Sequence, residues 1–255
     1  KSKVLDEIAP LQGASHADVT EYRVMDNGLG ALTTKGMTTL QDQSKFVGFS
    51  GDDALEKVLL KNNGLHVELV FDRTHVIGSR DQCGLADVRA ESAISAIMDC
   101  EDSVACVDAE DKVLAYGNWL GLMKGDLTDR FEKNGRTITR ELVPDRHYST
   151  PRGAELVLKG RSLLLVRNVG HLMTNPAILD KDGNEVPEGM MDAMITVLIA
   201  MHDLVREGGN SVHGSVYVVK PKLHGPDEVA LTDQIFSAVE QVLGIAPYTV
   251  KIGIM

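Results

Sequence analysis

The last third of the chain alternates short apolar runs with longer stretches of helical periodicity, and this alternation constrains the fold more than any other feature. The runs at 163–169, 215–220 and 249–255 are apolar and rich in β-branched residues, as buried strands are. Between them, 187–207 and 226–243 carry apolar residues at helical spacing. Strands that alternate with helices of this length predict parallel βα units, in an open sheet or a (β/α) barrel.

The earlier part of the chain has a different pattern. Residues 22–49 are rich in Gly, Thr and Asp and predict short strands and turns, and the alternating run 64–71 predicts another strand. Residues 52–61 are interpreted as a short helix that the asparagines and glycine at 62–64 end. "KNGR" at 133–136 places Asn-Gly between two strand-like runs, which is a strong hairpin signal. We therefore expect a separate α+β lobe.

Composition narrows the classes of partner. The chain has 26 basic and 37 acidic residues and a formal net charge of -11, so it has no broad basic surface for nucleic acid. No apolar run approaches the roughly 20 residues that span a bilayer, and residues 1–10 lack the layout of a signal peptide. Cys83, Cys100 and Cys106 have unrelated spacings, which favours reduced thiols in a cytoplasmic protein.

Polar side chains follow the predicted strands at their carboxyl ends, where parallel α/β folds place functional residues. Arg167 is the sharpest candidate, because a guanidinium is a fixed positive charge and a bidentate donor for a carboxylate or an enolate oxygen. The alternative is that Arg167 only pairs with Glu101 or Asp102 to close a sheet edge. The other polar residues at these ends are Asp99, Ser103, Asn168, His171, Lys220, Lys222 and His224.

These neighbouring groups leave their roles open. Glu101 and Asp102 could orient a ligand or bind a divalent cation through oxygen, although a salt bridge or helix cap is the more ordinary role. Lys220 and Lys222 could meet an anion or simply face solvent. His171 shows no metal-ligand spacing with the other histidines. No G-x-G-x-x-G, P-loop or G-x-S-x-G motif supports a nucleotide-binding or serine-hydrolase fold.

Four ordered stretches together resemble malate synthase of the G type, and the resemblance runs over essentially the whole chain. They are "MDCEDSVACVDAEDKVLAYGNWLGLMKG" (98–125), "RSLLLVRNVGHLMTNPAI" (161–178), "SVYVVKPKLHGPDEVA" (215–230) and "VKIGIM" (250–255). The resemblance is to the middle portion of that longer enzyme, so we expect this chain to be a fragment. It implies an α/β fold in which part of a TIM barrel carries an inserted α+β domain. The predicted barrel part is 93–123 and 161–255, and the predicted inserted domain is 1–92 and 124–160.

The resemblance also implies an activity and residues for it. Members of this family condense acetyl-CoA with glyoxylate and water in a Claisen-type reaction that gives malate and CoA, using Mg²⁺, in the glyoxylate cycle. Arg167, in "LVRNVGH", matches the catalytic arginine, which would bind glyoxylate and stabilise the enolate. Ser103, in "CEDS", and Arg140, in "TITREL", match positions that hold acetyl-CoA. Glu101 and Asp102 would shape the acyl-CoA pocket or brace Arg167. A monomer is expected for the full-length protein.

One departure from the family pattern limits what these residues could do alone. The family's magnesium carboxylates and its aspartate base would follow Met255, so we expect no metal ligand within this chain. Because deprotonating a thioester methyl needs a positioned base, we predict that the chain is inactive by itself. The alternatives are another barrel lyase acting on acyl-CoA or 2-oxo acids, and a non-catalytic structural or interaction module.

Overall fold

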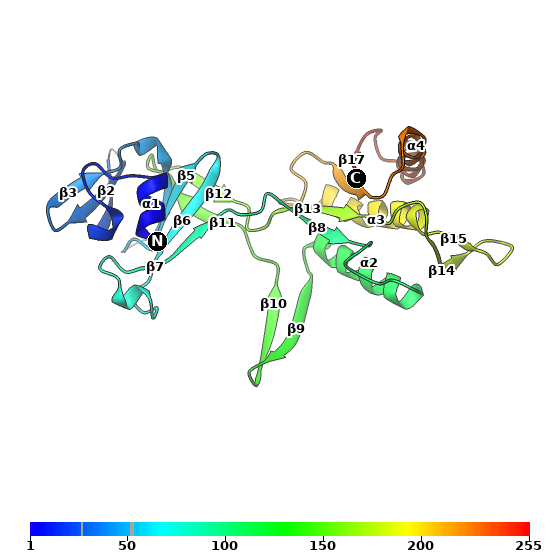
Figure 1. Ribbon diagram of the computed structural model, residues 1–255, viewed down its shortest axis with the longest axis horizontal. Helices are drawn as coiled ribbons and strands as arrows, with labels where there is room; N and C mark the ends of the chain where they lie inside the picture. The colour runs from blue at the N-terminus through cyan, green and yellow to red at the C-terminus, as the bar shows by residue number, and fades with distance from the viewer. Residues whose placement is uncertain (27, 52–53) are drawn as a thin grey trace. The chain divides into compact units, whose positions relative to one another are not determined.

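A computed structural model describes residues 1–26, 28–51 and 54–255, and its contacts divide the chain into two compact units (Figure 1). The first unit comprises Lys1–Ala93 and Pro144–Gly160, and the second comprises Ile94–Val143 and Arg161–Met255. None of the helices within the described residues is long and apolar enough to cross a membrane.

The first unit is built on antiparallel sheets. Its larger sheet has the strand order β12-β11-β4-β5-β6-β7, and a three-stranded sheet has the order β1-β2-β3. The helix α1 (Ser2–Ile8) precedes the strands. The strands are β1 (Val19–Met25), β2 (Gly28–Thr33), β3 (Gly36–Thr39), β4 (Phe46–Ser50), β5 (Lys57–Asn62), β6 (Leu65–Phe71), β7 (Leu85–Ala90), β11 (Arg146–Ser149) and β12 (Glu155–Leu158).

The predicted helix over 52–61 is wrong, since β5 occupies its second half; residues 52 and 53 lie outside the described part of the chain. Its Val58, Leu59 and Leu60 are all buried, as expected for a strand between β4 and β6 that is covered on both faces. Asn63 and Gly64 take positive φ angles of 48° and 82°. They therefore form the turn of the β5–β6 hairpin and do not end a helix.

The second unit contains a four-stranded, fully parallel sheet with the order β17-β16-β13-β8. Its strands are β8 (Ser95–Asp99), β13 (Leu163–Arg167), β16 (Val216–Lys220) and β17 (Val250–Ile254), and its helices are α2 (Ala109–Lys124), α3 (Glu188–Leu204) and α4 (Pro226–Leu243). The predicted alternation of strands and helices is therefore confirmed, and among the described residues the sheet is open at β8 and β17 and closes no barrel.

The helices begin and end where the local sequence dictates. Asp108 caps α2 by accepting the N–H of Asp111, and Gly125 ends the helix with a φ of 78°. Gly244 ends α4 in the same left-handed conformation. The core of this unit packs α2, α3 and α4 against the sheet. Its fully buried members include Trp119, Val166, Val197, Val218 and Phe236.

Two hairpins interrupt the βα pattern. The predicted hairpin at "KNGR" is β9 (Thr128–Lys133) with β10 (Arg136–Glu141), and both turn residues have positive φ angles. By contacts it belongs to the second unit, whereas the sequence prediction placed 124–160 in the inserted domain. The chain turns back against α2 at Gly121, which accepts the N–H of Leu127 and thereby ties the hairpin to the helix. The second hairpin, β14 (Thr174–Leu179) with β15 (Glu185–Pro187), was not expected.

Candidate functional site

The carboxyl ends of β8 and β13 bring Arg167 and Asp99 together. The two residues are register partners in the parallel pair, so their side chains leave the sheet side by side. Nε of Arg167 donates to Oδ1 of Asp99 at 2.7 Å, and Nη2 donates to Oδ2 at 2.6 Å. This bidentate geometry fixes the plane of the guanidinium, because rotating Arg167 would break both bonds.

The ion pair between Arg167 and Asp99 stabilises the charged form of the Asp99 carboxylate. The hydrogen bonds from Arg167 hold the pKa of Asp99 well below its usual range, and those from the Ser103 and Glu101 N–H groups lower it further. Asp99 occupies one edge of the guanidinium and leaves Nη1 on the other, where its contact is a donation to the weak acceptor Sδ of Met255 at 3.8 Å. Arg167 thus keeps donors for a second acceptor. Of the two predicted partners, Asp102 forms a longer ion pair with Arg167 at 3.9 Å, while Asp99, which was not predicted as a partner, is the main one.

The loop after β8 wraps around Asp99. The N–H groups of Glu101 and Ser103 each donate to an Asp99 carboxylate oxygen at 2.9 Å. The Glu101 carboxylate accepts the N–H of Gly170 at 2.8 Å and also pairs with Lys222. Asp102 pairs with the same ammonium at 2.8 Å. These two carboxylates therefore share the ammonium of Lys222, for which the sequence left two roles open, an anion site and a solvated face.

The two predicted acetyl-CoA residues lie on different elements. Ser103 is exposed on the loop after β8, directly beside Asp99. Arg140 is exposed on β10, with its guanidinium 4.7 Å from the centre of the Phe131 ring, in a cation–π arrangement. The structure therefore gathers Arg167, Ser103 and the acidic residues at one sheet edge, while Arg140 lies on the β9–β10 hairpin.

A buried polar network behind this edge went unnoticed in the sequence. Asp192 of α3 is fully buried, and its Oδ1 accepts from Nζ of Lys112 at 2.9 Å and from the Tyr116 hydroxyl at 2.6 Å. Lys112 also pairs with Glu188. Burial works to lower the pKa of Lys112, but the two carboxylates outweigh it and raise that pKa. The sequence signal for this network was a charged residue on the apolar face of each helix, Lys112 in α2 and Asp192 in α3.

Lys220 is the second buried cation of this region. It ends β16 with 1% of its surface exposed, and its Nζ donates to the carbonyl oxygen of Val169 at 2.6 Å. Burial lowers its pKa, because the interior solvates an ammonium less well than water does. The expectation of a solvated face is therefore wrong for Lys220, although its neighbour Lys222 is half-exposed.

The acidic groups of this edge do not by themselves fit a magnesium site. Mg²⁺ needs carboxylates that are free to face the metal, whereas Asp99 is engaged by Arg167, and Glu101 and Asp102 are engaged by Lys222. Within residues 1–26, 28–51 and 54–255, no three His, Cys, Asp or Glu side chains gather as a metal-ligand set.

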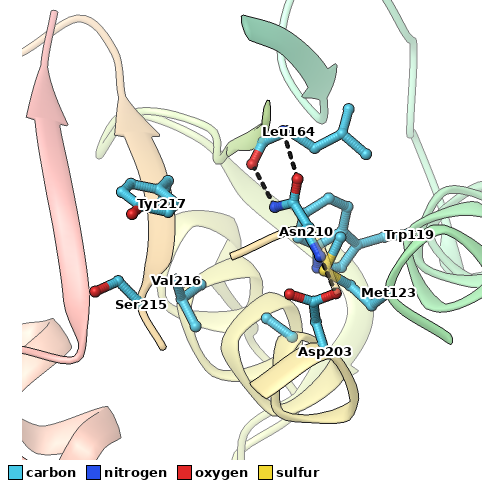
Figure 2. A pocket seen from close by; sticks show the side chains of 9 residues that line it. Trp119, Met123, Leu164, Asp203, Asn210, Ser215, Val216 and Tyr217 are labelled. Atoms are coloured by element: carbon cyan, nitrogen blue, oxygen red, sulfur yellow. Dashed lines mark hydrogen bonds between the residues drawn. The ribbon is translucent and has the colours of Figure 1, made fainter. Parts of the chain in front are cut away.

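The opposite end of the sheet has a small pocket of different character (Figure 2). Leu164, near the start of β13, exchanges two backbone hydrogen bonds with the Asn210 side chain, at 2.7 and 2.9 Å. Asp203 of α3 accepts the N–H of Asn210 at 2.6 Å and lies at the same pocket. Trp119 closes it from α2. The polar side chains here bond mainly to backbone groups, so we interpret the pocket as part of the structure that holds the sheet and its loops together.

Comparison with known proteins gives two family matches, one in each unit. The malate synthase TIM barrel domain matches residues 163–255, and the α/β insertion domain of malate synthase G matches residues 1–62. The malate synthase G of Corynebacterium efficiens is 52% identical over 255 residues, which cover 98% of this chain and 34% of the relative. The malate synthase G of Halalkalibacterium halodurans is 50% identical over 255 residues, which cover 98% of this chain and 35% of that relative.

The resemblance to malate synthase G is confirmed. The malate synthase G of Corynebacterium glutamicum adds a third relative, at 51% identity over 254 residues. The fold prediction is confirmed as well, since the chain combines part of a TIM barrel domain with an insertion domain. The chain spans about a third of the length of these malate synthase G relatives. Residues 63–162 lie outside both family matches, so the predicted domain boundaries there stay a prediction.

Proposed function

We propose that this chain supplies the Arg167 edge of a malate synthase active site. The reaction is the condensation of acetyl-CoA with glyoxylate, followed by attack of water on the thioester, to give malate and CoA. The observation that carries the proposal is the guanidinium of Arg167, held by Asp99 on one edge and left with donors on the other. Mg²⁺, a cytoplasmic location and a monomeric full-length protein are part of the same proposal.

Arg167 can contribute in two ways. Its Nη donors can bind the glyoxylate carboxylate and place the aldehyde carbon, and the same charge can stabilise the oxygen of an enolate formed from the acetyl group. When the acetyl methyl loses a proton, negative charge moves to the thioester oxygen, and a fixed cation lowers the cost of that charge. Asp99 keeps the cation in place, because its two hydrogen bonds would break if the side chain turned away.

The acyl-CoA side is assigned to two residues. Ser103 lies on the loop that wraps Asp99, so an acyl group bound there would be close to Arg167. Arg140 offers a guanidinium on the hairpin that suits a phosphate of CoA. Glu101 and Asp102 are assigned to the shape of this loop through Lys222. We propose no proton acceptor for the acetyl methyl among these residues, since each carboxylate at this edge is already paired with a cation.

The test replaces the matching third of the Corynebacterium efficiens malate synthase G by these 255 residues. We expect the chimera to form malate from acetyl-CoA and glyoxylate with Mg²⁺, and the 255-residue chain to form none above background. A folded chimera without activity, next to an active parent, would contradict the proposal that this chain carries the arginine edge of the site. Turnover by the isolated chain would contradict the proposed division of the site.

A further inference from the structure

The backbone of Val169, two residues after Arg167, is held from both sides by buried charged side chains. Its N–H donates to Oδ2 of Asp192 at 3.0 Å, and its carbonyl oxygen accepts from Nζ of Lys220 at 2.6 Å. Both side chains are buried, with 0% and 1% of their surface exposed. Charge-assisted hydrogen bonds of this kind are about twice as strong as neutral ones, so they define the position of this segment firmly.

Asp192 is in turn oriented by the helix α2. Lys112 and Tyr116 donate to its Oδ1, which leaves Oδ2 for the N–H of Val169. A further hydrogen bond joins α3 to the residues that follow β13, because the Asn168 side-chain amide donates to the Thr196 hydroxyl at 3.1 Å. The residues after β13 are therefore fixed by groups from α2, α3 and β16.

Residues 168–170 are bonded in turn to the loop that surrounds Asp99. The N–H of Gly170 donates to the Glu101 carboxylate at 2.8 Å, and Glu101 pairs with Lys222. Close packing underneath adds to this, because a Cβ at Gly189 would lie 2.7 Å from the carbonyl oxygen of Gly170 and 2.5 Å from Nζ of Lys220. Any shift of Val169 would therefore move Gly170 and the loop that surrounds Asp99.

We propose that Asp192 and Lys220 are positioning residues, which act through Val169 to hold Arg167 against Asp99 with its remaining donors open. The inference rests on the proposed function, because the positioned group is the arginine assigned to glyoxylate and the enolate. Burying an aspartate and two lysines costs desolvation free energy that apolar side chains would avoid. These side chains lie around one backbone residue, two positions after Arg167, and we infer that holding this residue in place is the gain that offsets their desolvation.

The test compares matched substitutions in the 255-residue chain, without any ligand. Asp192→Asn leaves one acceptor oxygen where three donors converge on two, so either Val169 or the Lys112–Tyr116 pair loses its acceptor. Lys220→Met removes the bond to the Val169 carbonyl and keeps Asp192 intact. The control is Asp203→Asn, also a buried aspartate of α3, which accepts backbone N–H groups of Asn210 and Ser211 at the other end of the sheet.

The readout is the NMR signal of the Arg167 Nε–H and the hydrogen exchange of the Val169 and Gly170 amides. We expect Asp192→Asn and Lys220→Met to speed these amides by at least about tenfold and to shift or broaden the Arg167 signal. Asp203→Asn should leave all three unchanged and speed exchange at residues 210 and 211. If Asp192→Asn fails to fold, Lys220→Met alone decides the question. Unchanged Arg167, Val169 and Gly170 signals in a folded variant would overturn the proposal.

A kinetic arm in the Corynebacterium efficiens chimera separates this inference from the proposed function. Asp192→Asn should lower kcat by at least about tenfold, and Asp203→Asn at matched temperature below its melting point should not. A wild-type chimera without activity would count against the proposed function, while the ligand-free NMR comparison would still decide the positioning role. Equal kcat in the two variants would overturn the positioning role, even in an active chimera.

Discussion

Two buried aspartates of the same helix hold loops at opposite ends of the parallel sheet, and they do so in different surroundings. At the amino ends of the strands, Asp203 accepts backbone N–H groups, and Asn210 bonds to the backbone of Leu164 (Figure 2). At the carboxyl ends, Asp192 bonds to the Val169 N–H but is surrounded by Lys112 and Tyr116. The cation that pairs with Asp203 is the partly exposed Arg206, whereas the cation that pairs with Asp192 is the fully buried Lys112.

We interpret the difference as a separation between support at one end of the sheet and chemistry at the other. Both aspartates hold a loop and each has a cation as partner, but only Asp192 needs a fully buried lysine. The buried lysines are concentrated next to Arg167, whose guanidinium is held by Asp99 and which we propose as the substrate-binding cation. In parallel α/β folds, chemistry is placed at the carboxyl ends of strands and stability at the amino ends.

Lys112→Met should produce the largest loss of stability, about 3–5 kcal/mol, because it leaves the carboxylates of Asp192 and Glu188 buried without their cation. The measurement is urea unfolding followed by the fluorescence of Trp119, the one tryptophan of the chain, which is buried in the second unit. Lys124→Met is the matched control on the same helix. It removes an exposed pair with Asp126 and should cost little. Equal losses in both variants would contradict the division.

Gly189→Ala should cost about 1–3 kcal/mol, because the added Cβ would meet the carbonyl oxygen of Gly170 at 2.7 Å. Gly117→Ala in α2 is the control. Nothing lies within 4 Å of its added Cβ, so it should stabilise the helix by about 0.5–1 kcal/mol. Urea unfolding gives both values. A Gly189→Ala variant as stable as the wild type would show that α3 and the segment 168–170 are not packed as closely as described.

Asn210→Ala should cost about 1–2 kcal/mol by removing two hydrogen bonds to the Leu164 backbone. Because this contact lies at the amino ends of the strands, the Arg167 Nε–H signal should stay in place. Urea unfolding and the NMR spectrum of the same sample measure the two effects. Loss of the Arg167 signal in a folded Asn210→Ala variant would break the distinction between the two ends.

The pH dependence of the Asp99–Arg167 pair should be the smallest effect, since the pair is partly exposed to solvent. The pKa of Asp99 is lowered in the folded state by its bonds to Arg167, so the folded state binds this proton less readily than the unfolded state does. The stabilisation is fully present above the ordinary aspartate pKa of about 3.9 and is lost as the pH falls below it toward the lowered pKa.

Asp99→Asn is the variant that isolates this effect. It should flatten the fall in unfolding free energy between about pH 4 and pH 2, and the difference from the wild type should be largest at neutral pH. Thermal unfolding across this pH range is the measurement. Parallel curves for the two proteins would mean that Asp99 titrates as in the unfolded chain, against the bidentate geometry.

Much of the second unit could be predicted from sequence, because its elements obey local rules. The strands that end in Lys220 and Arg167, the helices closed by Gly125 and Gly244, and the Asn-Gly hairpin all have signals within a few residues. The resemblance to malate synthase singled out Arg167, whose catalytic role stays a prediction. A local rule also failed, since Asn-Gly after β5 was interpreted as a helix end although it is a hairpin turn.

The partners of the site could not be predicted, because they depend on contacts distant in sequence. Asp99 and Arg167 are 68 residues apart, and Lys112 and Asp192 are 80 apart. Asp99 belongs to a run of acidic residues, and only the register of β8 against β13 selects it over Asp102. A lysine on an apolar helix face signals a buried partner in principle, but it does not say which carboxylate of another helix it meets.

The most direct test of the central claim is kcat of the Corynebacterium efficiens chimera with Arg167→Lys, compared with Arg206→Lys. Arg206 is the matched arginine at the amino end, where it pairs with Asp203. A lysine lacks the planar guanidinium that can donate to Asp99 and to the substrate at the same time, so we predict a loss in kcat of about 10²–10³-fold for Arg167→Lys. Arg206→Lys should keep kcat within about twofold. Equal activity of the two variants would contradict the assignment of catalysis to the Arg167 end of the sheet.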